Sequence, residues 1–177
     1  MTSIETPRLL LRRLQPGDLD DYHHVIYGDP DVMATLPSGQ ALSRQAFEAY
    51  VTPFMIEHWE THGFGPWAAI YKPENRLIGH CGLKYWPGAP NEVEVFYALD
   101  KRYWGRGLAT EGGRAALRYG FEQVGLGYIM GYALAVNTAS CRVLEKIGLR
   151  YEANFQYRGR EWTRYALQRQ GFKASNG

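Results

Sequence analysis

The 177-residue chain lacks several features that mark special classes of protein. Its two cysteines, Cys81 and Cys141, are too few for a disulfide framework, and both stand in apolar segments where a free buried thiol is expected. No apolar run approaches the ~18 residues of a membrane span, since the best, 128–136, is far shorter and contains a glycine. Residues 1–13 show no apolar core of the signal-peptide kind. We therefore expect a soluble, cytoplasmic protein.

Charge is distributed unevenly along the chain. Residues 1–100 carry 7 Lys and Arg against 13 Asp and Glu, a balance of −6, whereas residues 101–177 carry 13 against 5, a balance of +8. The net charge is only +2, and 45% hydrophobic with 21% charged residues is typical of a globular protein. The basic second half predicts contact with an anion. Charge alone leaves nucleic acid, a small polyphosphate cofactor and a merely solvated face open.

No internal repeat, low-complexity tract or long linker divides the chain, so we expect one domain over residues 1–177. Apolar periodicity and turn residues predict strands at 8–12, 67–71, 76–85, 92–99, 128–136, 151–157 and 161–167, and helices at 19–27, 43–60, 108–124 and 138–147. Pro53 is expected to break or kink the second helix. Because hairpins dominate, we predict an α/β (α+β) fold: a mixed, mostly antiparallel sheet of about six or seven strands flanked by about four helices.

The most informative segment is 102–111, which joins a predicted strand to the third predicted helix. Glycines at a helix N-terminus let backbone N–H groups surround an anion, and the helix dipole adds to the attraction. Gly105 and Gly107 match neither common nucleotide motif, because Thr110 replaces the third glycine of the dinucleotide pattern and Gly113 replaces the lysine of a P-loop. A tight turn without a ligand is the alternative.

Five motifs follow one another along the chain. They are Thr6-Pro7-Arg8-Leu9-Leu10-Leu11-Arg12, Leu77-Ile78-Gly79-His80-Cys81-Gly82-Leu83, Arg102-x-x-Gly105-x-Gly107-Leu108-Ala109-Thr110-Glu111, Asn137-x-x-Ser140-x-x-Val143-Leu144-Glu145-Lys146-Ile147-Gly148-Leu149, and Gly159-Arg160. The third is similar to the acyl-CoA-binding motif of the GNAT N-acetyltransferases. In this order the whole set resembles one branch of that family, the ribosomal-protein alanine acetyltransferases of the RimJ/RimL type.

The resemblance implies acetyl-CoA as cosubstrate and acetyl transfer to a primary amine. It implies that backbone N–H groups of the glycine loop hold the diphosphate, with cofactor contacts from Arg102, Trp104, Gly105, Arg106, Gly107, Leu108, Ala109 and Thr110. The strand edge at Phe96 and Tyr97 would pair with the pantetheine amides. Asn137 would bond to the pantetheine arm, with Ser140 near the thiol; a helix N-cap role for Asn137 is compatible with this.

Two residues are candidates for catalysis, Glu94 and Ser140. An amine attacks a thioester only as the neutral form, which at pH 7 is far commoner for an α-amine, with a pKa near ~7.8, than for a lysine near ~10.4. Glu94 stands where the branch commonly has Glu, and we expect it to accept the proton directly or through water, with Glu92 as fallback. The alternative for Glu94 is a solvent-facing strand acid. Ser140 is a candidate for protonating the thiolate, or else an ordinary helix serine.

Two positions depart from the family pattern. Many GNAT enzymes have a tyrosine seven residues after the Asn137 equivalent, and Leu144 stands there instead, which argues against a tyrosine acid at that position. Phe96 stands where glycine is common, and its ring would either narrow the acceptor channel or fill the core.

The leading hypothesis is an acetyl-CoA-dependent N-acetyltransferase acting on the N-terminal α-amine of a protein or peptide. The alternatives are a small amine acceptor (a polyamine, amino sugar or drug) and a non-catalytic acyl-CoA-binding module. Segments 36–41 and 86–91 are the expected acceptor loops. We expect no nucleic-acid or membrane partner, and a homodimer stays open. No metal site is expected, because Trp59 stands between His58 and His62 where a zincin needs Glu.

Overall fold

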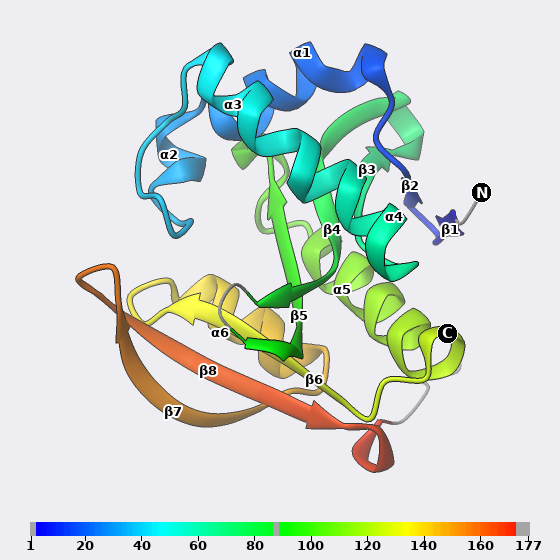
Figure 1. The fold of residues 1–177 in the computed structure, drawn as a ribbon, viewed down its shortest axis with the longest axis vertical. Coiled ribbons are helices and arrows are strands. Elements are labelled where there is room, and N and C mark those ends of the chain that lie inside the picture. Colours follow the sequence, from blue (N-terminus) through cyan, green and yellow to red (C-terminus); the bar gives the residue numbers. More distant parts are fainter. Residues whose placement is uncertain (1–2, 87–88, 173–177) are drawn as a thin grey trace.

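The structure is a computed structural model that describes residues 3–86 and 89–172. Within these ranges eight strands form one sheet, in the order β1-β2-β3-β4-β5-β6-β8-β7 (Figure 1). They are β1 (Ile4–Glu5), β2 (Leu9–Arg12), β3 (Pro66–Tyr71), β4 (Arg76–Trp86), β5 (Ala89–Leu99), β6 (Tyr128–Leu134), β7 (Arg150–Tyr157) and β8 (Arg160–Gln168). Every neighbouring pair is antiparallel except β5 and β6. The mixed, mostly antiparallel fold is confirmed, with the two-residue β1 as an additional strand.

Several of the predicted helices are composite. The α-helices are α1 (Leu19–Tyr22), α2 (Pro30–Met33), α3 (Arg44–Val51), α4 (His58–His62), α5 (Leu108–Tyr119) and α6 (Thr138–Lys146). Wider π-helical turns continue three of them, namely η2 (His23–Tyr27), η3 (Thr52–Glu57) and η6 (Gly120–Val124). Pro53 lies in η3. Because proline lacks the N–H that the i−4 carbonyl would accept, the helix widens there and continues into α4.

The sheet buries both of its faces, because alternate strand residues point to opposite sides. On β5, Val93 and Val95 belong to a core shared with α5 and α6, whereas Ala98 belongs to a second core with η2 and α3. On β3, Trp67 likewise belongs to the first core and Ala68 to the second. Side chains on the two faces of β5 therefore meet different helices, and this alternation decides which candidate residues can meet.

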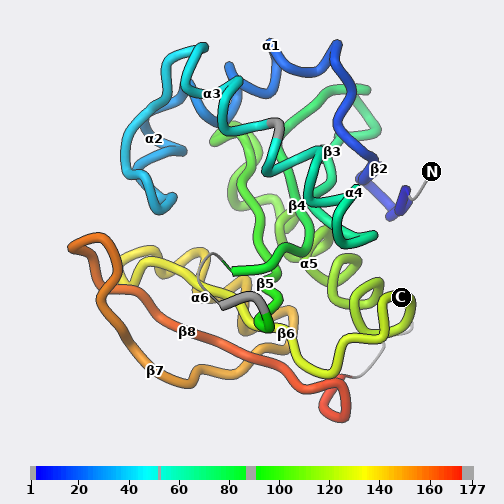
Figure 2. Tube along the Cα trace, viewed as in Figure 1, coloured from blue at the N-terminus to red at the C-terminus, as the bar shows by residue number. Residues whose placement is uncertain are grey.

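The one parallel pair of the described sheet, β5 and β6, separates along its length. These two strands are in register only at Glu94 and Met130. On its other edge, β5 pairs with β4 from Ala89 to Leu99. Figure 2 shows β5 continuing toward the N-terminal helices while β6 turns away. Beyond Glu94, residues 95–99 thus keep an edge with no strand partner in the described chain, and an extended polar chain could add there as a strand does.

A carboxylate in the first turn of α5 ties that helix to the N-terminal strands. Glu111 accepts hydrogen bonds from Thr6 Oγ1 at 2.6 Å, Arg8 N at 2.8 Å and Arg8 Nε at 2.7 Å. Arg8 Nη1 also donates to the carbonyl of Arg106 at 2.8 Å. Burial alone would raise the pKa of Glu111, but these hydrogen bonds outweigh burial and lower it. Glu111 therefore anchors both the helix start and the loop before it.

Replacing Glu111 with glutamine is expected to lower the free energy of unfolding by about 1–3 kcal/mol at pH 7, because charged hydrogen bonds are lost. A lowered folded pKa means that this stabilisation is present above the ordinary carboxyl value of 4.5 and is lost as pH falls through the folded value. The difference in unfolding free energy between wild type and Glu111→Gln should therefore become smaller in acid, as measured by urea unfolding. Glu48→Gln, at an exposed pair with Arg44, is the control, with an expected cost below ~0.5 kcal/mol. A difference in unfolding free energy that does not change with pH would contradict the role of ionised Glu111.

Candidate active site

The loop between β5 and α5 offers a row of backbone donors. Gly105 and Gly107 have φ of 74° and 76°, a left-handed conformation that glycine adopts without a Cβ penalty. Gly107 is the N-cap of α5, with no side-chain cap. In the described chain, the N–H groups of residues 105–110 donate to no protein acceptor. Successive free donors at the positive end of a twelve-residue helix suit a diphosphate.

Most side chains of this loop hold its shape. Arg102 Nε lies 3.0 and 2.9 Å from the two carboxylate oxygens of Asp100, which also accepts from Arg102 N. Burial alone would raise the pKa of Asp100, but the bonds from Arg102 lower it below its usual value. Trp104 Nε1 donates to the carbonyl of Leu99 at 2.7 Å, and the guanidinium of the exposed Arg106 lies 4.9 Å from the ring centre of Tyr103. Arg102 thus acts on the loop, and a ligand would meet mainly backbone.

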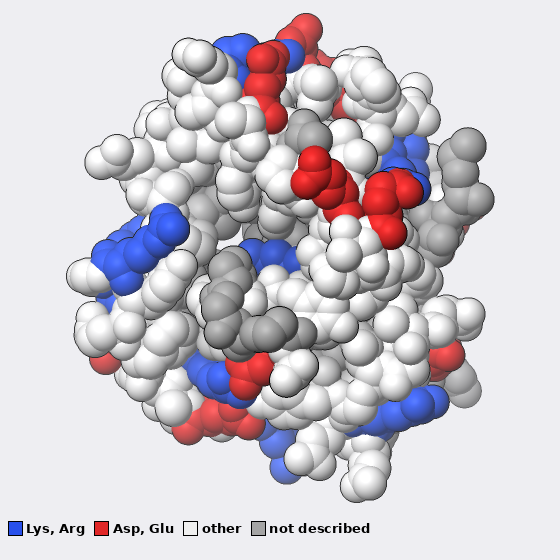
Figure 3. All heavy atoms as spheres, in the orientation of Figure 1, with Lys and Arg blue, Asp and Glu red and all other residues white. Residues whose placement is uncertain are grey.

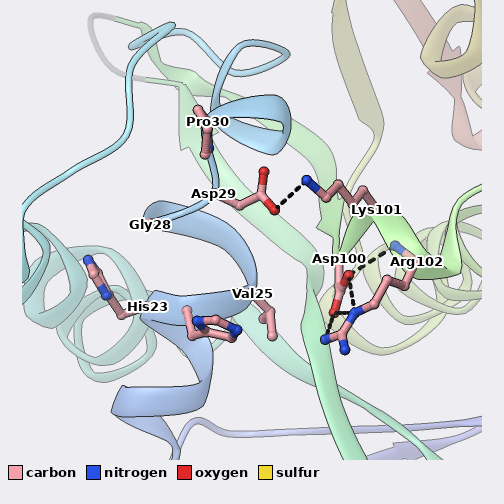
Figure 4. A pocket seen from close by; sticks show the side chains of 9 residues that line it. His23, Val25, Gly28, Asp29, Pro30, Asp100, Lys101 and Arg102 are labelled. Carbon is pink, nitrogen blue, oxygen red and sulfur yellow. Dashed lines mark hydrogen bonds and ion pairs between the residues drawn. The ribbon is translucent and has the colours of Figure 1, made fainter.

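A cleft of about 450 Å³ lies beside the start of this loop, between η2 and η5 (Lys101–Tyr103) (Figure 4). Its charged groups are already paired, since Lys101 contacts Asp29 at 3.2 Å and Asp31 at 2.6 Å, and Arg102 is held by Asp100. The ion pairs of Lys101 connect the α2 segment to the loop. Neither Lys101 nor Arg102 offers an unpaired positive charge to an anion in this cleft.

Three predicted residues meet where β5 and β6 separate. The side chain of Asn137 caps α6, its Oδ1 accepting from Ser140 N at 3.1 Å. Tyr97 Oη lies 3.1 Å from both the Oγ and the carbonyl oxygen of Ser140. Burial raises the pKa of Tyr97 well above its usual value, so the phenol keeps its proton. The N-cap role of Asn137 is present, and the Tyr97–Ser140 hydroxyl pair adds a side-chain contact that the sequence argument had not assigned to Tyr97.

Leu144 is a core residue. It is 1% exposed, and a Cβ on Gly131 of β6 would lie 2.6 Å from its Cδ2. A side chain at 131 would therefore displace Leu144, which packs between α6 and β6 as part of the core. The hydroxyl groups that approach this split come from Tyr97 and Ser140 instead.

Glu94 lies on the opposite face of β5 from Tyr97 and is almost completely buried. It is 5% exposed, which rules out the solvent-facing alternative. It stands directly across from Lys84 on β4, with Lys84 Nζ 3.2 Å from Oε2. Burial raises the pKa of Glu94 above its usual value, although the charge of Lys84 acts in the opposite direction. A buried carboxylate beside a single ammonium is a group whose protonation can be tuned.

Aromatic rings surround this ion pair. The centres of the Phe54, Trp86 and Phe96 rings lie 5.4, 5.6 and 4.9 Å from Lys84 Nζ. Phe96 is half-buried and also packs on Phe54 and His80 at 5.3 and 5.2 Å. Phe96 therefore joins the wall of the Lys84–Glu94 pair to the core below it. Figure 3 shows a hollow between the N-terminal helices and the β6–β8 part of the molecule, with Lys or Arg atoms inside it.

Glu92, the fallback base, is engaged elsewhere. Its two oxygens lie 3.2 Å from the guanidinium of Arg164, which also contacts Glu152 and the Tyr128 hydroxyl. This network occupies both carboxylate oxygens of Glu92 with one guanidinium, whereas Oε2 of Glu94 makes no well-directed hydrogen bond in the described chain.

The ring nitrogens of His58, the first of the two spaced histidines, are engaged within the fold. The two rings are in contact, but both nitrogens of His58 face backbone groups: Nδ1 lies 2.8 Å from the Phe64 carbonyl, and Nε2 accepts from Tyr85 N at 3.0 Å. Within residues 3–86 and 89–172 there is no group of three or more His, Cys, Asp or Glu that could hold a metal ion. In the same ranges no helix is long and apolar enough to cross a membrane.

His80 is buried behind Phe96, with its Nδ1 2.8 Å from the Tyr22 hydroxyl, and burial lowers its pKa to about 3. The unfolded chain, with an ordinary pKa of 6.5, binds this proton more readily, so His80 makes stability fall as pH drops from 6.5 toward 3. The slope contributed is up to about 1.4 kcal/mol per pH unit. In His80→Gln we expect a shallower loss of unfolding free energy between pH 6.5 and 5, above the range of most carboxylates. Equal slopes for the two proteins would refute this.

Comparison with known proteins gives the family. A family profile described as an acetyltransferase (GNAT) domain matches residues 8–150. YkkB of Bacillus subtilis, named an uncharacterized protein, is 31% identical over 169 residues, covering 92% of this chain and 91% of that protein. A GNAT-family acetyltransferase from Bacillus anthracis has a TM-score of 0.80 at 27% identity and covers 96% of this chain and 99% of its own.

RimL, a ribosomal L7/L12 α-N-protein acetyltransferase solved with coenzyme A, also has a TM-score of 0.80 and covers 94% of this chain and 98% of its own. Its 15% identity shows a shared fold alone. The family profile spans most of the sequence, and the 31% identity to YkkB extends along almost all of both chains. The protein therefore belongs to the GNAT family of N-acetyltransferases.

Proposed function

We propose that this enzyme, as one domain over residues 1–177, transfers the acetyl group of acetyl-CoA to a primary amine. When bound, acetyl-CoA supplies an activated acetyl thioester. The carrying observation is that the edge of β5 without a strand partner, residues 95–99, runs toward the N–H groups of residues 105–110, which donate to no protein acceptor in the described chain; on this edge the Leu99 carbonyl is taken by Trp104 Nε1. An extended arm that ends in a diphosphate matches both features. The backbone groups of Tyr97 would bind the arm, with Asn137 across the split, whereas in this register those of Phe96 face Gly82 on β4 and are not available.

Glu94 is the proposed acceptor of the amine proton. A carboxylate near the unpaired β5 edge lies where an amine approaching the arm would arrive, and Glu92 is already bound to Arg164. Burial brings the pKa of Glu94 closer to neutral pH, where a general base is most efficient. Positioning of the amine adds to this and can supply up to ~7–11 kcal/mol in favourable cases.

Ser140 is the proposed donor of a proton to the thiolate, with Tyr97 as its hydrogen-bond partner. Their oxygens are 3.1 Å apart at the start of α6. The N-terminal end of α6 would also stabilise a developing negative charge. This arrangement places a hydroxyl near the split without a tyrosine at position 144.

The first candidate acceptor is the N-terminal α-amine of a protein or peptide, as in the RimJ/RimL branch. Support comes from the ordered motifs of the sequence and from a fold shared with RimL. An α-amine also needs less help from a base than a lysine does.

A small amine is the second candidate, and one contact favours it. At the β7–β8 turn, Arg160 donates to the carbonyls of Leu36 and Ala34 at 3.1 and 2.6 Å. This joins the expected acceptor loop 36–41 to the far hairpin and would limit the size of the acceptor. Of the second expected loop, 86–91, residues 87 and 88 lie outside the described ranges.

Arg160→Ala is expected to release this bridge and to raise KM for small amines several-fold, while improving turnover of peptide acceptors relative to them. Arg158→Ala, at the same turn but with its guanidinium on the Tyr157 ring, is the matched control. Steady-state rates with one small amine and one peptide would measure the ratio. A ratio that is unchanged in Arg160→Ala would remove the argument for a small acceptor.

The function is tested by following release of coenzyme A from acetyl-CoA across N-terminal peptides and small amines, with mass spectrometry locating the added acetyl group. Calorimetry with coenzyme A tests the binding step separately. A folded protein that gives no heat with coenzyme A would overturn the proposal, whereas binding without turnover for any amine would favour the non-catalytic module.

A further inference from the structure

We propose that Lys84 is a positioning residue for the proton transfer, which holds Glu94 as an oriented carboxylate ready to accept the amine proton. The assignment of that proton to Glu94 rests on the proposed function. The relation between Lys84 and Glu94 does not, because it follows from the sheet itself.

The register of β4 and β5 sets the pair. Lys84 and Glu94 are directly opposite in a long antiparallel ladder that runs from Gly79↔Leu99 to Tyr85↔Val93. Side chains that face each other in this way lie close enough to interact. Lys84 Nζ is 3.2 Å from Glu94 Oε2, and the two side chains are only 16% and 7% exposed. Oε2 makes no well-directed hydrogen bond within the described chain, so the ammonium is its nearest charged neighbour.

Aromatic rings restrict the ammonium to this place. The rings of Phe54, Trp86 and Phe96 come from η3, β4 and β5, so three separate segments enclose Lys84. A ring attracts a cation without accepting its charge into an ion pair. Lys84 is thereby held near Glu94 by neighbours that do not compete for it as a second carboxylate would.

The other ionisable groups around the pair come from several elements that pack near it, among them His58 of α4, whose pKa burial and nearby positive charge lower. The remaining groups are Tyr50 of α3, His80 of β4, Tyr97 of β5, Tyr132 of β6, Tyr157 of β7, and Arg158 in the β7–β8 turn, with Glu92 and Arg164 paired to each other nearby. Burial raises the pKa of Tyr50, Tyr97 and Tyr132, so these phenols keep their protons at neutral pH, and burial keeps His80 neutral. Lys84 is consequently the cation in direct contact with Glu94.

The chemical consequence concerns one proton. A buried carboxyl group prefers its neutral form, and a protonated Glu94 has no free site for the proton that leaves the amine nitrogen. The positive charge of Lys84 favours the ionised form. During transfer the N–H bond of the amine breaks, an O–H bond forms on Glu94, and Lys84 keeps its own protons. Without Lys84, Glu94 would remain protonated to higher pH.

The first test needs no acetyl-CoA. A raised folded pKa of Glu94 makes the unfolding free energy fall as pH rises through that value. In Lys84→Met we expect the upper end of this fall to extend to higher pH by about one unit or more, the usual effect of an adjacent opposite charge, because only the folded pKa changes. Lys84→Arg should restore the wild-type profile, and Lys84→Met combined with Glu94→Gln should abolish the fall. Lys84→Gln serves if the methionine variant does not fold. A profile in Lys84→Met and Lys84→Gln that superposes on wild type would overturn the proposal.

The second test is the pH profile of kcat/KM with one amine. The acid limb of Lys84→Met should move up by the same amount as its stability profile, with activity recovered at high pH, and Lys84→Arg should behave as wild type. If only the stability profile moves, the pair exists but has no part in proton transfer, and the positioning role fails. If no variant and no wild-type protein turns over any amine, the proposed function fails while the stability result still stands.

Discussion

The double variant Gly105→Ala, Gly107→Ala is expected to lose affinity for coenzyme A by roughly 10- to 100-fold. Both glycines adopt left-handed backbone, which costs an alanine about 1–2 kcal/mol per residue. The strained loop would relax and turn its N–H groups away from a bound diphosphate. Losing even one charged hydrogen bond of about 1.5–3 kcal/mol gives an affinity loss of this size. Titration calorimetry with coenzyme A measures the effect.

Two other glycines of the chain provide a matched control for the effect of backbone strain alone. Gly63 and Gly125 have φ of 72° and 81°, and a Cβ at either would meet no heavy atom within 4 Å. Gly63→Ala, Gly125→Ala should therefore lose similar stability in urea unfolding while binding coenzyme A like wild type. Equal affinity losses in the two double variants would show that strain, and not the donor loop, causes the effect.

Glu94→Gln is expected to lower kcat/KM by roughly 10²- to 10⁴-fold near neutral pH, the usual contribution of a general base. Glutamine keeps the size of the side chain but cannot accept the amine proton. The loss should shrink as pH approaches the pKa of the acceptor amine, because the amine is then neutral without help. It should also be smaller for an α-amine than for a lysine-like amine.

Glu92→Gln is the matched control, since Glu92 lies two residues earlier on the same face of β5 and is paired with Arg164. Its pH–rate profile should keep the wild-type shape. The measurement is a full profile of kcat/KM for both variants and wild type. A Glu94→Gln enzyme with an unchanged profile would eliminate Glu94 as the base, and a loss confined to Glu92→Gln would transfer the role.

The sequence predicted the local features well. The glycine loop, the N-cap at Asn137 and most helix and strand positions depend on residues close together in the chain, where backbone propensity and capping act. The resemblance to the GNAT family likewise rested on short motifs, and the match of a GNAT domain profile to residues 8–150 confirmed the family.

The contacts that give the site its chemistry were decided by tertiary structure. Lys84 was not singled out, because a lysine on a strand is ordinarily solvated; its role arises from the β4–β5 register and from rings contributed by distant segments. Tyr97 meets Ser140 only because β5 and α6 approach each other. Period-two alternation in 92–99 could have indicated that Glu94 and Tyr97 face opposite sides.

By itself the sequence determined the order of most elements and the glycine loop at the start of α5, since turn geometry and helix ends are local properties. Only the folded chain decided which acid is buried, which cation faces it and which loops are bridged by Arg160. The physical reason is that burial and pairing energies depend on distances between residues far apart in sequence, and those distances are set by sheet register and by packing on both faces.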